Sequence, residues 1–302
     1  MDEYFPAYLN YIEKMKNLDF KTLKAYKTDL TQFFNFMKSK NKDFNRDTIF
    51  LYIEQLHDNF KPKTVKRKIA SIKAFTSYCE IEHHLDINPF HSIKLKYKEP
   101  FSLPKTINTS DLQTILETVY QFRNKAKTPS TKYRSNRDIA VLELLFSTGI
   151  RVSELCCLNN EDVNLLEHYI RIMGKGSKER IVQITNEDVL KILTDVYNEN
   201  GNLTSPFLLN RDGHRLSEQS VRQIINKYVK KANLKIHVTP HMFRHTFATL
   251  LLEEDVDIRY IQKILGHSSI LTTQIYTHVS TRQQRLILEL KHPRNKLVIS
   301  HI

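Results

Sequence analysis

Residues 241–245 read His-Met-Phe-Arg-His and directly follow Pro240, which is well placed in the first turn of a helix. His241 and Arg244 are three residues apart, so they would share one face of that helix. His241 and His245 are four apart, a spacing that could hold zinc. The zinc-protease pattern, however, needs Glu directly after the first His, and position 242 is Met. We therefore expect no metal at these residues.

Phosphodiester chemistry needs positive charge at the nonbridging oxygens, a nucleophile, and an acid for the leaving oxygen. No carboxylate cluster in the sequence suggests a two-metal nuclease. The chain offers isolated cations beside helix breaks instead. Arg151 follows a Thr-Gly-Ile interruption between two apolar helical stretches, near a new helix N-terminus whose N–H groups also favour an anion.

The overall charge is typical of a protein with an anionic partner. Lys and Arg number 46 against 33 Asp and Glu, which gives a net charge of +13 over 302 residues. A basic surface that only aids solubility is the alternative.

The N-terminus resembles neither a secretory signal nor a transit peptide, and no apolar run is long enough to span a membrane, so we expect a cytoplasmic protein. Three cysteines without a Cys-x-x-Cys pair argue against structural disulfides and a zinc ribbon.

The first half of the chain is predicted to be helical, because its first 148 residues contain no glycine. Apolar spacing predicts helices over about 20–37, 48–56 and 64–78. The last of these carries charges of nearly one sign, without acidic partners at helical spacing, which favours contact with phosphates over a merely solvated face. The cations of this basic face that we predict to contact DNA are Lys63, Lys66, Arg67, Lys68 and Lys73.

Prolines divide the chain into two predicted domains. We expect a helical domain over 1–95, a linker over 96–105 and a second domain over 106–302, whose first helix starts with a capping box at Ser110. The other predicted elements are a polar loop over 125–136, a buried helix over 137–147, strands over 169–172 and 180–184 that form a hairpin with a basic tip, and helices over 217–231, 240–253 and 258–265.

Four motifs then occur in a specific order: 148–155, 174–180, 241–249, and 265–269 followed by 276–278. In this order they resemble the tyrosine recombinase (phage-integrase-like) family, most closely its XerC/XerD-like branch. Residues 292–294, His-Pro-Arg, resemble the C-terminal signature of that branch. The resemblance implies a mainly α fold with two domains. These would be an all-helical, SAM-like core-binding domain and an α+β catalytic domain of helices with a small antiparallel sheet.

The resemblance also implies a reaction. Tyr276 would attack the scissile phosphorus and form a 3′-phosphotyrosyl link, while Lys175 would protonate the departing 5′ oxygen. Because the link keeps the energy of the broken bond, rejoining would need neither ATP nor metal, and we expect no cofactor. The enzyme would be a site-specific recombinase for chromosome dimer resolution, or for integration, excision or inversion of a mobile element.

Other residues of the motifs would support this reaction. The resemblance implies that Arg151 and Arg244 clamp the phosphate with their planar forks, and that His241 assists proton movement or orients the phosphate. His267 would donate a hydrogen bond to the phosphate, and Glu154 would hold the basic residues in place.

Several further positions have simpler interpretations. Lys178 and Arg180 lie on the hairpin, where a basic strand end serves DNA backbone contact or only solubility. His245 and His278 are interpreted as supporting or packing residues, and Cys156 and Cys157 as core residues.

The resemblance implies an assembly on double-stranded DNA. A tail helix over about 281–290 would dock Leu286 and Leu290 on a neighbouring subunit and so link four protomers around two DNA sites in a homo- or hetero-tetramer. A second recombinase or an accessory activator would be a possible partner, with the protein associated with the nucleoid. A tail folded on its own domain is the alternative.

The sequence departs from its relatives at three places. Asp255 stands where they usually have Gly, in a turn that could need a positive φ; Gln183 replaces a usual Pro; and 125–136 is longer than the corresponding loop. These departures leave the choice between a housekeeping and a mobile-element role open. Two alternatives to a recombinase are a relaxing topoisomerase with related chemistry and a non-catalytic, sequence-specific DNA-binding or architectural protein.

Overall fold

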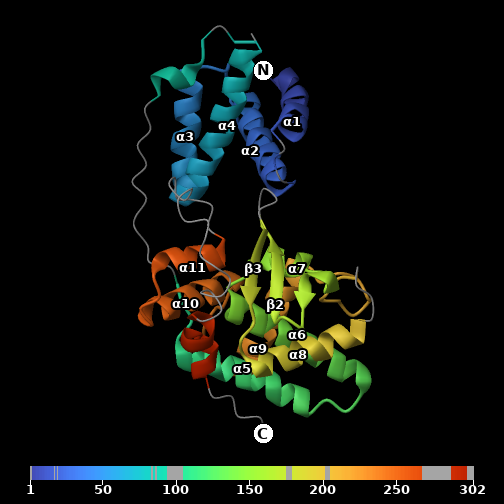
Figure 1. Cartoon of the computed structure of the whole chain (residues 1–302). Coiled ribbons are helices and arrows are strands. Elements are labelled where there is room, and N and C mark those ends of the chain that lie inside the picture. Colours follow the sequence, from blue (N-terminus) through green and yellow to red (C-terminus); the bar gives the residue numbers. More distant parts are fainter. Residues whose placement is uncertain are drawn as a thin grey trace. The chain divides into compact units, whose positions relative to one another are not determined.

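The computed structural model describes residues 2–16, 18, 20–82, 84–85, 87–93, 105–174, 179–200, 205–266 and 287–297. The chain divides into two compact units, Met1–Ser102 (the N-terminal unit) and Leu103–Ile302 (the C-terminal unit) (Figure 1). Each unit has a separate hydrophobic core. None of the helices in these described ranges has the length and apolar character needed to span a bilayer.

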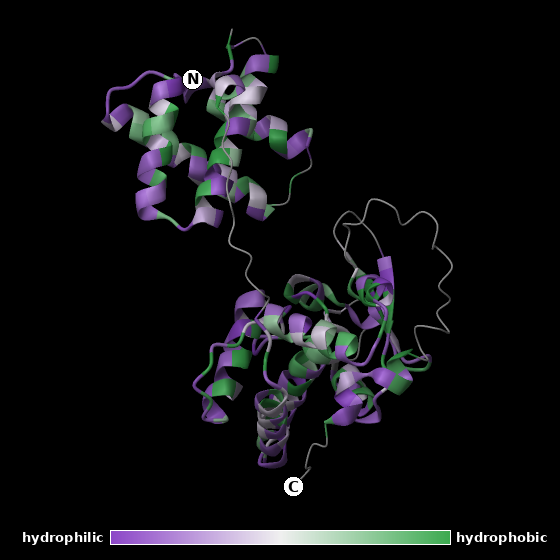
Figure 2. Cartoon of the chain, turned by 90° about the vertical axis from the view of Figure 1, so that its left-hand side faces the viewer, coloured by the Kyte–Doolittle hydropathy of each residue, from purple (hydrophilic) through white to green (hydrophobic). Residues whose placement is uncertain are grey.

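The N-terminal unit is a bundle of helices, and each of them carries both hydrophilic and hydrophobic residues (Figure 2). Its main elements are η1 (Asp2–Tyr4), α1 (Phe5–Lys14), α2 (Phe20–Ser39), α3 (Arg46–Asn59), α4 (Pro62–Ile81) and η2 (Pro89–Ser92). Aromatic rings fill the core, where Phe75 of α4 packs edge-on against Phe34 of α2 at 5.4 Å and against Tyr8 of α1 at 5.2 Å between ring centroids. The three helices predicted here are confirmed; α1 was not predicted.

The C-terminal unit combines helices with one small sheet. Its helices are α5 (Thr109–Asn124), α6 (Pro129–Thr148), α7 (Val152–Cys157), η3 (Asn160–Asp162), α8 (Glu187–Asn200), α9 (Glu218–Lys231), α10 (Pro240–Glu253), α11 (Ile258–Leu265) and η5 (Pro293–Lys296). Every residue of α6 from 136 to 148 is buried, and α5, α8 and α10 pack around it. The predicted buried helix is therefore confirmed as the centre of this core.

The sheet has three antiparallel strands in the order β1 (Val163–Asn164), β2 (Tyr169–Met173) and β3 (Glu179–Gln183). Ile170 pairs with Val182, and Ile172 pairs with Arg180. The predicted hairpin is thus confirmed, and its tip at 175–178 lies outside the described residues.

Three local predictions are wrong. The capping residue of α5 is Asn108, whose side chain accepts from the N–H of Ser110, so the helix begins before the predicted capping box. The polar stretch 125–136 is mostly helix, because Thr128 caps α6 and Pro129 opens it. Cys156 is buried as predicted, but Cys157 is exposed. Asp255 does adopt a positive φ of 58°.

Only part of the predicted tail helix can be compared with the structure, since Leu286 lies outside the described residues. Residues 287–291 are helical, and their buried apolar side chain is that of Leu288, which joins the core of the C-terminal unit. Leu290 is 80% exposed, so the described part of the chain leaves it largely uncovered.

The chain after this helix is anchored by His292, Pro293 and Arg294, here called the C-terminal clasp. Arg294 Nε donates to both carboxylate oxygens of Glu143 on α6, at 3.0 and 2.9 Å, and both side chains are buried. The Tyr120 hydroxyl donates to the same carboxylate at 2.9 Å. Nδ1 of His292 accepts from the N–H of Arg294, so its Nε2 carries the proton that bonds the Ser147 carbonyl at 2.6 Å.

The buried imidazole of the C-terminal clasp makes the protein less stable in mild acid. Burial lowers the pKa of His292 from 6.5 to about 4. Below pH 6.5 the imidazole becomes protonated in the unfolded chain, whereas in the folded chain it stays neutral down to about pH 4. The free energy of unfolding therefore falls by about 3 kcal/mol between these two pH values. Denaturant titrations from pH 4 to 7 should show this loss in the wild-type protein. In His292→Gln, the pH profile should be flatter by the same amount; equal slopes would contradict the assignment.

Candidate active site

Three arginines converge on the C-terminal end of α11. Arg180 Nε donates to the Ile264 carbonyl at 3.0 Å, Arg244 Nη2 to the Leu265 carbonyl at 2.7 Å, and Arg151 Nη2 to the Gly266 carbonyl at 3.2 Å. These carbonyls form the negative end of the helix dipole, which suits cationic side chains. The arginines come from β3, from α10 and from the N-cap of α7, so three separate elements bring positive charge to one point.

Glu154 on α7 joins two of these arginines. Its carboxylate accepts from Arg151 Nη1 at 2.7 Å and from Arg180 Nη2 at 2.6 Å, and it also accepts from the N–H of Arg151 at 3.0 Å. Burial alone would raise the pKa of Glu154, but the hydrogen bonds from Arg180 and Arg151 outweigh burial and hold that pKa below its usual value. The carboxylate is therefore ionised at neutral pH and fixes both guanidinium groups.

Arg244 is the most enclosed of the three arginines, at 5% exposure. Its Nη1 donates to the Gly149 carbonyl at 2.6 Å, and its Nη2 holds α11 as described above. Burial, together with the charges of Arg151 and Arg180, lowers the pKa of Arg244 to about 9. The guanidinium is still protonated at neutral pH, and a nearby anion would be strongly favoured because it would offset the repulsion among the three cations.

Gly149 allows α10 and α11 to lie close against the end of α6. It ends α6 with a φ of +60°, in the left-handed region, and a Cβ at this position would lie 2.5 Å from Leu265 and 2.8 Å from Phe247. Any side chain here would force α11 and α10 away from the end of α6. It would also displace Arg151, which lies two residues after Gly149.

His241 lies in the first turn of α10, three residues before Arg244, and its side chain is exposed. It lines a hollow together with His237, His245 and Lys105. Burial, together with His241 and Arg244 nearby, lowers the pKa of His245. Among the residues that the structure describes, no three His, Cys, Asp or Glu side chains are grouped so that they could hold a metal ion.

One residue predicted from sequence needs a correction, and others lie beyond what the structure describes. Arg180 was interpreted as a basic strand end facing DNA or solvent, but its side chain is 10% exposed and is held by Glu154 and the Ile264 carbonyl. It therefore belongs to the arginine cluster. Lys175, Lys178, His267 and Tyr276 lie outside the described residues, as does His278.

Family models match both units of the chain. Residues 107–283 match the phage integrase family, and residues 5–83 match the N-terminal SAM-like domain of phage integrases. The chain belongs to the phage integrase family. It is a tyrosine recombinase, an enzyme that breaks and rejoins DNA strands at specific sites.

Similar proteins agree with this family over nearly the whole chain. A tyrosine recombinase of Agathobacter rectalis is 50% identical, with 97% of each chain covered. Tyrosine recombinase XerC of Thermodesulfovibrio yellowstonii is 38% identical, again with 97% of each chain covered. Tyrosine recombinase XerD of Staphylococcus saprophyticus is 36% identical, covering 97% of this chain and all of the relative. The predicted resemblance to the XerC/XerD-like branch is confirmed.

Solved structures share the fold. XerH recombinase bound to its difH substrate has a TM-score of 0.67 at 22% identity, covering 91% of this chain and 81% of that one. Lambda integrase residues 75–356 bound to DNA has a TM-score of 0.66 at 17% identity, covering 99% of both chains. The predicted fold class, mainly α with a SAM-like domain and an α+β catalytic domain, is confirmed.

The basic face of α4 in this recombinase is smaller than predicted. Lys63, Lys66 and Lys73 are exposed, and Arg67 is 44% exposed. Lys68 is 3% exposed, with its amine bonded to Asp29 and Gln32 of α2. The assignment of Lys68 to the DNA-contacting face is therefore wrong, because a carboxylate on a neighbouring helix draws this charge into the interior.

Asp29 holds α2 against α4. Its carboxylate is fully buried and accepts from Lys68 at 3.2 Å, from Ser71 at 3.0 Å and from Arg67. We expect Asp29→Asn to destabilise the N-terminal unit by about 3 kcal/mol, because Lys68 would keep a buried charge without its counterion. Hydrogen exchange of α2 and α4 peptides would measure this loss, with Lys63→Gln on the exposed face as a control that should change little. Unchanged exchange in Asp29→Asn would contradict the role of this carboxylate.

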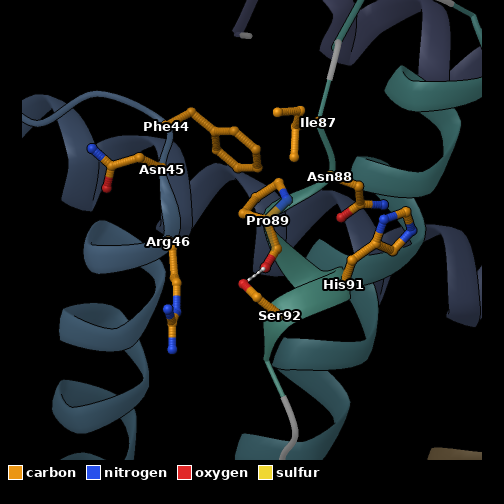
Figure 3. A pocket seen from close by; sticks show the side chains of 8 residues that line it. All are labelled: Phe44, Asn45, Arg46, Ile87, Asn88, Pro89, His91 and Ser92. Carbon is orange, nitrogen blue, oxygen red and sulfur yellow. Dashed lines mark hydrogen bonds between the residues drawn. The ribbon is translucent and has the colours of Figure 1, made fainter.

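A separate hollow in the N-terminal unit is not a candidate site. Phe44, Pro89 and Ile87 face one another across it (Figure 3). Its polar groups serve local structure: Asn45 caps α3 by accepting from Thr48, and Asn88 caps η2 and donates to Glu80. The two basic side chains that line it, Arg46 and His91, are exposed rather than buried.

Proposed function

We propose that this recombinase cleaves one strand of duplex DNA with Tyr276 as nucleophile, while Arg151 and Arg244 bind the scissile phosphate. The observation that carries this proposal is the convergence of both guanidinium groups on Leu265 and Gly266. These residues directly precede the segment 267–286, which contains His267 and Tyr276. The arginine pair and the nucleophile would thus meet at one end of α11.

In the proposed reaction every bond formed or broken and every proton moved is accounted for by the DNA and the residues of this chain, without a cofactor. The Tyr276 oxygen would form a bond to phosphorus, the bond from phosphorus to the 5′ oxygen would break, and Lys175 would give that oxygen its proton. His241 would accept or orient the proton of the nucleophile, and His267 would donate to a nonbridging oxygen. A 5′ hydroxyl of another strand would then reverse these steps and release Tyr276. The arginine forks stabilise the charge that gathers on the phosphate in both directions.

Glu154 would act by positioning. Because it bonds Arg151 and Arg180 at once, it would keep the forks in place when the phosphate displaces their contacts to α11 carbonyls. In the N-terminal unit, Lys63, Lys66, Arg67 and Lys73 of α4 would contact the DNA backbone, and Lys178 at the hairpin tip would add a contact from the C-terminal unit. We assign 1–95 as the core-binding domain, 96–105 as the linker and 106–302 as the catalytic domain.

The assembly we propose is a tetramer on two DNA sites within the nucleoid, made of this chain alone or with a second recombinase. Two solved relatives of the same fold support it by analogy: XerH was solved bound to difH, and lambda integrase as a tetramer bound to a Holliday junction. The exposed Leu290 of the tail would be covered by a neighbouring subunit. The role would be chromosome dimer resolution, or integration, excision or inversion of a mobile element.

Covalent capture in the native cell tests the chemistry and finds the site together. Cells expressing the protein would be lysed in denaturant, the protein recovered with its attached DNA, and the strand ends sequenced. We expect discrete ends linked through their 3′ phosphate at one sequence. Attachment at 5′ ends, or no attached DNA from well-expressed protein, would contradict the proposal.

A further inference from the structure

Every nitrogen of the Arg180 guanidinium is bonded within the protein. Nη1 donates to Oε1 of Glu154 at 3.1 Å and Nη2 donates to Oε2 at 2.6 Å, so the fork meets the carboxylate at two points. Nε donates to the Ile264 carbonyl at 3.0 Å. A Cβ at Gly266 would lie 3.0 Å from Cδ of Arg180, so the end of α11 packs directly on this side chain. Arg180 could bond a phosphate only by giving up one of these contacts.

Arg151 has a different environment, although it shares Glu154 with Arg180. Its side chain is 34% exposed, against 10% for Arg180. Its Nη1 bonds Oε1 of Glu154 at 2.7 Å, and its Nη2 bonds the Gly266 carbonyl, a main-chain group that a phosphate oxygen could replace. The two arginines on this carboxylate are therefore unequal, because Arg151 is open to an anion and Arg180 is enclosed.

The charges of this group give Arg180 a specific effect on Arg151. A buried carboxylate that pairs with one guanidinium cancels its charge, which would weaken the attraction of Arg151 for a phosphate. Arg180 adds a second positive charge at the same carboxylate, so two cations face one anion and the group keeps a net positive charge. Glu154 can thereby orient Arg151 without neutralising it.

We propose that Arg180 is a positioning residue for strand cleavage: by binding both oxygens of Glu154, it fixes the carboxylate that orients Arg151 and offsets the negative charge of that carboxylate. This inference rests on the proposed role of Arg151 in binding the scissile phosphate. Arg180 itself donates nothing to the phosphate, because both of its terminal nitrogens stay on Glu154. It acts on the rate through the placement of the Arg151 fork, since a displacement of about 1 Å in an active site costs up to ~100-fold.

The first test compares Arg180→Met with a matched variant, Arg137→Met. Arg137 is 11% exposed and likewise bonds a carboxylate, that of Asp138, and a main-chain carbonyl, that of Leu209. Both variants should be less stable. Only Arg180→Met should slow single-turnover formation of the covalent complex, by about tenfold or more, with DNA affinity changed less than about threefold. The substrate is a duplex carrying the captured sequence, at a temperature well below both melting points.

A double variant shows whether Arg180 acts through Glu154. In a Glu154→Gln background the carboxylate is already lost, so adding Arg180→Met should slow cleavage by no more than about twofold further. If Arg180 acted on cleavage by another route, the losses of the two single variants would multiply.

The pH profile is a readout that a general loss of stability would not move. Burial alone would raise the pKa of Glu154, and the hydrogen bond from Arg180 is the strongest of the contacts that lower it. Arg180→Met should therefore raise this pKa, with Arg151 and Arg244 as the remaining cations beside the carboxylate. Its cleavage rate relative to wild type should fall as the pH is lowered from about 7.5 to about 5.5, because Glu154 becomes protonated. The ratio for Arg137→Met should stay constant.

A further readout needs no DNA. The guanidinium nitrogen NMR signals of Arg151, identified by their loss in Arg151→Lys, report how freely this group rotates. Rotation should be hindered in the wild type and in Arg137→Met, and faster in Arg180→Met. Arg180→Lys keeps a charge at Glu154 but loses the fork, so it should be intermediate in both rate and rotation. The same comparison is made with Arg180→Lys alone if Arg180→Met does not fold.

The outcomes separate the inference from the proposed function. Wild-type cleavage by Arg180→Met, equal slowing by Arg137→Met, or multiplied losses in the double variant would overturn the positioning role of Arg180. Wild-type cleavage by Arg151→Met would instead overturn the proposed phosphate contact of Arg151. The rotation of Arg151 is measured on the free protein, so its being unchanged in Arg180→Met would count against the positioning role in either case.

Discussion

Tyr276→Phe is expected to abolish covalent attachment to DNA, with a loss of at least ~10⁴-fold in rate, and to leave DNA affinity within about twofold of wild type. Phenylalanine keeps the ring but lacks the oxygen that would bond to phosphorus. Affinity should persist because cationic side chains on other elements supply the phosphate contacts. Quantitative gel detection of protein–DNA adducts after denaturation measures the first effect, and binding to the captured sequence measures the second.

The matched control is Tyr260→Phe on α11, which removes the same hydroxyl from a neighbouring tyrosine of the same unit. It should form adducts at the wild-type rate. Adducts formed by Tyr276→Phe, or lost in Tyr260→Phe alone, would move the nucleophile to another residue.

Arg244→Lys is expected to slow strand cleavage by about 100-fold or more, while DNA binding changes only a few-fold. The two Nη groups of Arg244 bond two separate carbonyls, those of Gly149 and Leu265, and a shorter lysine with one ammonium would not keep both bonds. A lysine would also lose the planar fork that matches two phosphate oxygens at once. Single-turnover kinetics on the captured sequence would measure the loss as a change in rate rather than in affinity.

Arg215→Lys offers a matched control for this substitution. Arg215 also donates from one Nη to main-chain carbonyls, those of Cys156 and Leu158, and it lies in the same unit. A small rate effect in Arg215→Lys beside a large one in Arg244→Lys would assign the loss to the active site. Equal effects would mean that the guanidinium contacts serve only to hold the fold.

Much of the fold follows from local patterns in the sequence. The stripe of apolar residues along 20–37 and the alternation over 169–172 each predicted an element that the structure confirms. The start of α6 was missed because 129–136 is polar, and its helix depends on Thr128 and Pro129 rather than on an apolar stripe. Apolar periodicity in the sequence indicates the buried face of a helix, so it does not detect a helical turn whose residues all face solvent.

The errors at charged residues have a common cause. Lys68 was grouped by charge with its neighbours, although it falls between Val65 and Ile72 at helical spacing and so lies on the buried face. Arg180 is two residues from the buried Val182, and residues two apart on a strand share one face of the sheet. Periodicity would have placed both side chains inward. The partners that allow it, Asp29 and Glu154, come from elements that only the folded chain brings near.

The pairing of Lys68 with Asp29 lowers the number of cations on this protein that can neutralise DNA phosphates. A cation that is already neutralised within the fold carries no mobile counterions to exchange, and it neutralises no phosphate. The salt dependence of DNA binding should therefore reflect the cations of both units that contact phosphates, at close to one released ion for each contact, and Lys68 should add nothing to it. Titrations of affinity against salt concentration would count these phosphate contacts.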